Sequence, residues 1–302
     1  MKLRNFVFIS AFLVGSMFVK VPTGEAKFLP ENDLHLHDNL SLISNVTESQ
    51  FNSIIDQAVE FYEPIIASHG GTLVMKRDWQ SSTVNAYASR NEDNWIVMMF
   101  GGLARRPEVT PDGFAMVVCH EMGHHLGGFP EVVYWASNEG QADYFASQVC
   151  AKRMWKDQTS INAGFRSQVN EVAKSKCDSV YKNVEDQNLC YRISVAGESL
   201  ATMLAVLREN VVPSYSTPDQ NKVSRTINSH PEPQCRLDTY LAGAICTTEF
   251  DDFIIPGRGF GNRWEAEKEA INLSCSQFNP DHIYSQKPGC WYKQRYNESF
   301  AL

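Results

Sequence analysis

Apolar residues recur along the first third of the chain in patterns that predict one long helix and two strands. In residues 49–66 they return every three or four positions, the spacing of a helix with one buried face. Residues 72–75 and 95–100 are short runs in which β-forming side chains are frequent, and they predict strands.

Two helices are predicted in the middle of the chain. The first covers residues 110–126, with Asp112 as a candidate cap and two glycines directly after its end. The second starts near Asn138, with Gln141 three residues later as in a variant capping box, and continues to about residue 155.

The second half contains a further predicted helix over residues 196–209. Residues 157–190 are more polar and predict an insertion, and residues 213–233 carry four prolines and predict a surface loop. Many helices and few strands place the chain in the α+β class, with helix dominant.

The N-terminus has the pattern of a signal peptide. Lys2 and Arg4 precede an uncharged apolar run, residues 6–19, which is shorter than the roughly 20 residues that span a bilayer. Residues 24–26 offer a cleavage site after Ala26, and an uncleaved anchor is the alternative. No later segment has the pattern of a membrane span, so we expect no stable membrane insertion after cleavage.

The charge of the chain excludes one class of partner. The formal net charge of −8 becomes −10 when the signal peptide is removed, because three bases and one acid leave with it. An acidic chain without a basic cluster is a poor candidate for nucleic-acid binding. The oligomeric state cannot be deduced from the sequence.

All eight cysteines lie after the signal peptide and predict disulfides in an oxidising compartment. None forms the CxxC pair of a zinc ribbon. Eight cysteines allow 105 pairings. Pairing each with its neighbour, which is a guess, gives Cys119–Cys150, Cys177–Cys190, Cys235–Cys246 and Cys275–Cys290.

The main chemical signal is HEMGH, residues 120–124. Four residues advance a helix by about 400°, so His120 and His124 lie one turn apart on one face. That spacing lets both imidazoles bind one zinc ion, and Glu121 can take the proton of a water that the zinc activates. Gly123 is costly inside a helix and indicates that another element approaches closely there. Two histidines on a helix face without metal are the alternative interpretation.

Three positions could supply a third ligand. The sixth residue after His124 is Pro130, which cannot bind zinc. His125 points about 100° away from His124. Glu139, on the following predicted helix, completes a His₂Glu set with one open position, and Asp143, one turn later, can bind the far nitrogen of a ligand histidine. A solvated carboxylate pair is the alternative. A bridge between Cys119 and Cys150 would hold the two helices together.

Four elements in order resemble the gluzincin metallopeptidases of the HtpX and CAAX prenyl protease type. They are Asn85-Ala86-Tyr87-Ala88, the strand 95–100 with Gly102-Leu103, HEMGH with Glu139 and Asp143, and Ser229-His230-Pro231 followed by Arg236. The resemblance covers roughly residues 84–240, and its middle is far more specific than its ends. Unlike the membrane-embedded members, this chain lacks several hydrophobic helices, so prenylated or membrane-protein substrates are not implied.

The resemblance implies a zincin-like fold in which a small sheet packs on the active-site helices. It implies zinc ligands His120, His124 and Glu139, one ion per chain, and Glu121 as base. It also suggests that His230 or Arg236 approaches the oxyanion or the metal; an ordinary loop histidine is the alternative for His230.

The strand 95–100 is expected to offer an exposed edge to which an extended peptide can add, with Trp95, Val97 and Met99 along it. The Arg105-Arg106-Pro107 loop is expected beside the cleft, more readily as a solvated loop than as a site for acidic substrates.

The expected organisation is a loose lead-in over residues 27–48 and one metallopeptidase domain over residues 49–302, whose C-terminal part holds disulfides. The lead-in could also be a short prosegment in which His35 and His37 contact the metal.

The sequence thus predicts a zinc endopeptidase that acts on proteins or peptides in a bacterial periplasm or outside the cell. The alternative is a non-catalytic chaperone or binding module with a structural zinc. A structural zinc has no use for a base such as Glu121 beside an open coordination position.

Overall fold

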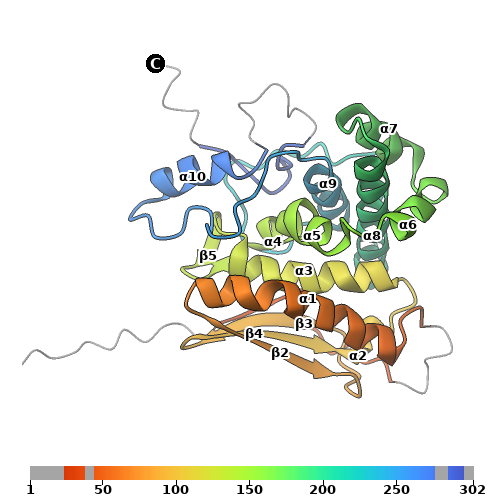
Figure 1. Cartoon of the computed structure of the whole chain (residues 1–302), viewed down its shortest axis with the longest axis horizontal. Helices are drawn as coiled ribbons and strands as arrows, with labels where there is room; N and C mark the ends of the chain where they lie inside the picture. The colour runs from red at the N-terminus through yellow and green to blue at the C-terminus, as the bar shows by residue number, and fades with distance from the viewer. Residues whose placement is uncertain (1–23, 38–43, 276–284, 296–302) are drawn as a thin grey trace, which may run out of the picture.

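A small mixed sheet lies under a larger set of helices (Figure 1). The structure is a computed structural model and describes residues 24–37, 44–275 and 285–295. The predicted α+β class with helix dominant is confirmed. The strands are β1 Glu25–Lys27, β2 Thr72–Asp78, β3 Ala86–Asn91, β4 Asn94–Phe100, β5 Glu131–Val133 and β6 Ala136–Ser137.

The helices fill the rest of the fold; those predicted from residues 49, 110 and 138 begin within two residues of these positions, whereas the one predicted from residue 196 begins at Val184. They are α1 Glu48–Ser68, α2 Gly101–Ala104, α3 Pro111–Leu126, α4 Glu139–Phe145, η2 Ala146–Cys150, α5 Ala151–Trp155, α6 Thr159–Ala163, η3 Gly164–Ser167, α7 Glu171–Val180, α8 Val184–Leu207, α9 Pro233–Ala244 and α10 Arg263–Asn272. The predicted helix from residue 138 to about 155 is therefore present, with a π-helical stretch, η2, in its middle.

The main sheet has the strand order β1-β3-β4-β2. β2 pairs with β4 in parallel, and β3 pairs antiparallel with both β4 and β1. The prediction that residues 95–100 form an exposed edge is wrong, because β4 is bonded on both sides. Trp95, Val97 and Met99 are buried instead in the core, as the alternating burial along β4 requires.

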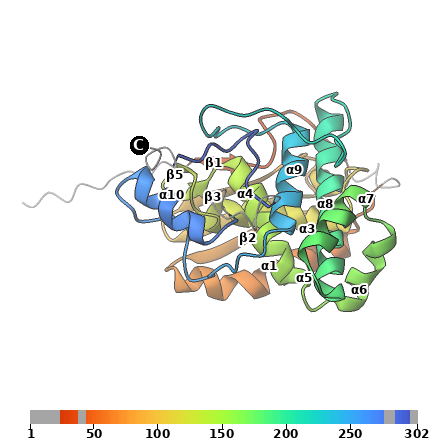
Figure 2. The same ribbon diagram turned by 90° about the horizontal axis from the view of Figure 1, so that it is seen from above.

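Helices α1 and α3 cover one face of this sheet, α1 against β2 and α3 against β3 and β4. On the side of α3 away from the sheet lie α4 and α5, followed by α9, and Figure 2 shows α9 beside α8. The α3 helix is therefore the centre of the fold, and all its residues from Gly113 to Leu126 are buried. A helix in this position can present polar side chains only to an internal site.

Local signals explain where the helices begin. At α1 the Thr47 side chain accepts from the Gln50 backbone, and the Gln50 side chain accepts in return from the Thr47 backbone. At α3 the cap is Thr110, whose hydroxyl accepts from the Gly113 backbone. The predicted cap, Asp112, instead binds Arg192 of α8 with two bonds of 2.7 and 2.8 Å.

All eight cysteines are paired, as predicted. The bridges Cys119–Cys150 and Cys177–Cys190 match the predicted pairs, whereas the other four cysteines form Cys235–Cys290 and Cys246–Cys275. The predicted Cys235–Cys246 bridge is wrong because helix α9 separates its two ends. Cys235 lies nine residues before the end of α9, a rise of about 14 Å, far beyond the roughly 4.4–6.8 Å between bridged Cα atoms. Four disulfides indicate a non-cytoplasmic compartment.

The signal peptide prediction mostly concerns residues 1–23, which lie outside the described residues. Residues 24–26 belong to the described part, and Glu25 and Ala26 form most of β1. The predicted loose lead-in differs from the structure at its start, because Phe28 and Leu29 are buried in the main core. His35 bridges to Thr83 and its ring contacts Ser82, and it does not belong to the group of His120, His124 and Glu139 that could hold a metal ion.

Among the described residues one helix, α8, is long and apolar enough by length and composition to cross a membrane. The sequence had suggested no such segment after the signal peptide. Most of its apolar stretch, 67%, is buried inside the fold. Core helices of folded domains often have the length and composition of a membrane span.

Candidate metal centre

The candidate centre lies where α3 packs against α4. His120 and His124 lie one turn apart on α3, and Glu139 is the first residue of α4. The Asn138 side chain caps α4 by accepting from the Gln141 backbone. The Gln141 side chain does not complete the predicted capping box; it donates to the carbonyl of Gly127 after the end of α3.

Gly123 explains how closely the two helices pack. A Cβ atom at this position would lie 2.8 Å from the carbonyl oxygen of Ala142 and 2.9 Å from its Cα atom. The close approach that the sequence suggested at Gly123 is therefore present, and the element that approaches is α4. The disulfide Cys119–Cys150 also joins α3 to the end of η2, beside the candidate centre.

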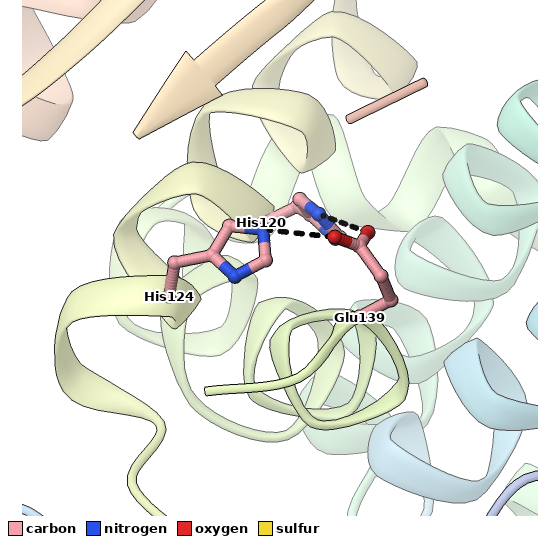
Figure 3. Close-up of side chains that lie close together, drawn as sticks. All are labelled: His120, His124 and Glu139. Atoms are coloured by element: carbon pink, nitrogen blue, oxygen red, sulfur yellow. Dashed lines mark ion pairs between the residues drawn. The ribbon is translucent and has the colours of Figure 1, made fainter. Parts of the chain in front are cut away.

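The structure brings His120, His124 and Glu139 together (Figure 3). His120 Nε2 lies 3.3 Å from Glu139 Oε2, and His124 Nε2 lies 3.7 Å from Glu139 Oε1. One ligand atom from each side chain falls within 4.8 Å of the others, and all three residues are buried. Two imidazoles and a carboxylate at such distances could hold one divalent ion.

The second ring nitrogen of each histidine, Nδ1, has a hydrogen-bond partner on the side away from the centre. His120 Nδ1 lies 2.8 Å from Asp143 Oδ1, and His124 Nδ1 lies 2.9 Å from the carbonyl oxygen of Ser137. A carbonyl can only accept, so His124 carries its proton on Nδ1 and turns the lone pair of Nε2 toward the centre. Asp143 therefore lies where the sequence predicted it, behind a candidate ligand.

The atoms that face the centre have no hydrogen-bond partner in the described part of the chain. They are His120 Nε2, His124 Nε2 and Glu139 Oε2. Both carboxylate oxygens of the buried Glu121, which interacts electrostatically with His120 and Glu139, also lack a hydrogen-bond partner there. Buried polar atoms are almost always satisfied, and each exception requires an explanation. Several such atoms converging on one point fit a cation and its water better than they fit a hydrophobic core.

Burial and neighbouring charges shift the pKa values of these groups in different directions. Burial lowers the pKa of His124 to about 4. Burial alone would also lower the pKa of His120, but Asp143 and Glu139 outweigh it and raise that pKa to about 9. Burial raises the pKa of Glu121 well above its usual value. A strongly shifted carboxyl group beside convergent histidines is typical of a functional site.

Arg236 of α9 and Asp143 form a buried ion pair behind the centre. The guanidinium donates to both oxygens of Asp143, with two bonds of 2.7 Å, and Tyr240 donates to Oδ1 at 2.8 Å. Burial alone would raise the pKa of Asp143, but Arg236 and His120 outweigh it and lower that pKa. Arg236 thus lies beside the centre, as the resemblance suggested, but its head group is bound to Asp143. No pattern in the sequence indicated a role for Tyr240.

His230 also lies next to the centre. Its Nε2 is 3.4 Å from Glu139 Oε2 and 2.7 Å from the carbonyl oxygen of Lys27. It forms one wall of a cleft of about 520 Å³ whose other lining residues include Lys27, Leu29, His124, Trp135 and Glu139. His230 therefore lies beside the candidate ligands, as the resemblance suggested.

Other candidate residues lie elsewhere. His125 turns away from the centre, stacks between Trp95 and Trp135, and places Nε2 3.1 Å from the carbonyl oxygen of Ile96. Arg105 is buried and donates to backbone carbonyls, so it is no solvated loop residue beside the cleft. Arg106 pairs with its neighbour Glu108 at 2.8 Å.

The substitution Gly123→Ala is expected to separate α3 from α4. The added methyl group meets backbone of Ala142, which cannot move without α4, so we expect a loss of about 1–3 kcal/mol in the free energy of unfolding and weaker zinc binding. Thermal unfolding and zinc titration measure the two effects. Gly164→Ala is the matched control, because a Cβ atom there meets nothing within 4 Å. Unchanged zinc affinity in Gly123→Ala would contradict the role given to this contact.

Comparisons with known proteins give no relative. No family model matches the chain, and no curated protein and no solved structure matches it.

Proposed function

We propose that this protein is a zinc-dependent endopeptidase that acts outside the cytoplasm. The observation that carries the proposal is the convergence of ligand atoms from the buried His120, His124 and Glu139. The buried carboxyl group of Glu121, which has no hydrogen-bond partner in the described part of the chain, interacts electrostatically with two of these residues. The ligand set His₂Glu, drawn from an HExxH helix and a following helix, is one that catalytic zinc sites use. The proposal includes a zincin-like fold and the gluzincin resemblance described above.

The residues present suit peptide hydrolysis. Zinc held by His120, His124 and Glu139 would supply a Lewis acid for a peptide carbonyl and for water. Glu121 would accept the proton of the attacking water and pass it to the leaving nitrogen. His230 reaches a backbone carbonyl in the cleft and could donate to the oxygen of the bond being cleaved.

Asp143 and Arg236 act as positioning residues in this proposal. Asp143 holds the ring of His120 through Nδ1, and Arg236 and Tyr240 hold Asp143 in turn. Such partners behind a ligand fix the plane of its ring and increase its basicity toward the metal. The His₂Glu set is therefore supported by a connected buried network.

The four disulfides support a location outside the cytoplasm, and the signal-like N-terminus extends this to a periplasmic or secreted protein of a bacterium. Substrates would then be proteins or peptides of that compartment.

Metal analysis of the purified protein tests the zinc site. We expect about one zinc ion per chain, and a large loss of bound zinc in His120→Ala, His124→Ala and Glu139→Ala, because each removes one of three protein ligands. His69→Ala is a suitable control, since His69 is bonded to the backbone of Asp252 away from the centre. Full zinc occupancy in all three ligand variants would exclude this site.

Hydrolysis of casein by the zinc-loaded protein separates the two functions that the sequence left open. Zinc without cleavage, together with binding of unfolded chains, would favour the non-catalytic chaperone or binding module. Cleavage that ceases when zinc is removed by a chelator and returns when zinc is restored is the expected result.

A further inference from the structure

The N-terminal part of the chain runs through the cleft beside the candidate metal centre. Strand β1 pairs antiparallel with β3, with Ala26 opposite Ala88 and Lys27 opposite Tyr87. β1 is the outermost strand of the sheet, so it covers the side of β3 that would otherwise be an open edge. A substrate peptide was predicted at the edge of strand 95–100; at the edge of β3 the chain's own segment is bound in this way.

The backbone after β1 continues this pairing. Phe28 N donates to the carbonyl oxygen of Ala86 at 3.1 Å, and Leu29 N donates to Asn85 Oδ1 at 3.0 Å. Asn85 Nδ2 donates in return to the carbonyl oxygen of Leu29 at 3.3 Å. These bonds involve only main-chain atoms of the segment, so they do not depend on its sequence.

Two carbonyls of the segment are held by residues of the candidate centre. His230 Nε2 donates to the carbonyl oxygen of Lys27 at 2.7 Å, and Arg236 Nη1 donates to that of Phe28 at 3.2 Å. Because His230 Nε2 also lies 3.4 Å from Glu139, the Lys27 carbonyl lies close to the proposed zinc ligands. The carbonyls of two successive peptide bonds, Lys27–Phe28 and Phe28–Leu29, are therefore bound by residues at the centre.

One side chain of the segment is fully enclosed. The Phe28 ring is completely buried, meets the ring of His120 edge-on at 5.0 Å, and lies 4.6 Å from the guanidinium of Arg236. Glu25 and Lys27, by contrast, form ion pairs near the surface. Main-chain bonds along a strand edge with one deep apolar pocket are a common way of binding an extended peptide.

We infer that the cleft is a binding site for extended peptides carrying a large apolar residue, and that Lys27, Phe28 and Leu29 are an intramolecular ligand that must leave before another peptide enters. The inference rests on the proposed function in taking the cleft as the substrate site. Cleavage after Ala26 would not empty the cleft, because all three residues remain in the mature chain. Tethering gives such a segment an effective concentration in the millimolar range, so free peptides compete against it at a disadvantage.

Hydrogen–deuterium exchange on the zinc-loaded full chain tests the inference, with Glu121→Gln present so that no peptide is consumed. The probe is a synthetic peptide with the sequence of residues 24–31. We expect the amides of Phe28 and Leu29 to exchange at least tenfold faster than those of central strand β4, because the segment leaves while the sheet stays folded. Adding the probe should accelerate their exchange further. Exchange of these two amides at the rate of β4, with or without probe, would overturn the inference.

Fluorescence anisotropy of the labelled probe gives a second measurement. Phe28→Ala, in the same Glu121→Gln background, removes the buried side chain that holds the segment. The probe should therefore bind this variant at least tenfold more tightly than it binds the chain that keeps Phe28. Phe253→Ala is the matched control, because Phe253 is 75% exposed and lies outside the cleft. A probe in which the residue corresponding to Phe28 is glycine should lose most of its affinity. Equal binding of both probes would contradict the apolar pocket.

The outcomes distinguish this inference from the proposed function. Displacement of the segment by the probe, in a protein that cleaves no casein, would uphold the peptide site and reject the peptidase. Casein cleavage with the segment permanently in place would uphold the peptidase and reject the intramolecular ligand.

Discussion

Replacing Glu121 by glutamine is expected to lower the rate of casein or peptide hydrolysis by about 10²–10⁴-fold, the usual contribution of general acid–base catalysis. The amide has nearly the same shape as the carboxyl group but cannot accept the proton of the attacking water. Zinc content should remain at one ion per chain, because Glu121 is not among the three residues whose ligand atoms converge. Initial rates and metal analysis on the same preparation measure both effects.

The exposed Glu60 of α1 offers the control variant Glu60→Gln, which should cleave at the rate of the unaltered protein. Substantial hydrolysis in Glu121→Gln would reject the role proposed for Glu121. Loss of zinc together with activity would instead assign Glu121 to metal binding.

Replacing Arg236 by leucine is expected to destabilise the fold by about 3–5 kcal/mol, because it leaves the carboxylate of Asp143 buried without a cationic partner. Both side chains are essentially inaccessible to solvent, at 1% and 0% exposure. The loss should also disturb His120, whose Nδ1 is bound to Asp143. Chemical denaturation of the disulfide-intact protein measures the change.

Arg208→Leu is the matched control, since Arg208 forms an ion pair with the largely exposed Glu232. An exposed pair of this kind contributes about 0–1 kcal/mol. The double variant Arg236→Leu, Asp143→Leu should recover part of the stability, because no unpaired charge remains buried. A single Arg236→Leu variant as stable as Arg208→Leu would show that the buried pair contributes little.

Where helical geometry alone determines the relative positions of residues, the sequence was sufficient to predict which of them meet at the candidate centre. His120 and His124 are one turn apart on any helix, and Pro111 at the start and the two glycines after Leu126 mark the ends of α3 in the sequence. Placing Glu139 required only that the next helix pack against α3. The glycine at position 123 gave a separate indication of that contact.

The sheet edge could not be predicted in the same way. β1 has three residues and β3 six, and neither is a run of β-forming apolar residues like the one that identifies β4 in the sequence. Their pairing depends on backbone bonds between segments about 60 residues apart, which no local pattern records. The positions of His230 and Arg236 could not be predicted from a local pattern either. Only the family resemblance suggested them, because the packing of α9 decides where they lie.

The bridge between Cys119 and Cys150 links the chemistry of the centre to the compartment in which the chain folds. In the reducing cytosol the thiols would stay apart, and α3 would be held to η2 by packing alone. Closing a loop of this length adds about 3–4 kcal/mol to stability. If the centre cleaves peptides, a precursor still inside the cell would therefore have a less firmly held active site, and the proteins of its own host would be spared until export is complete.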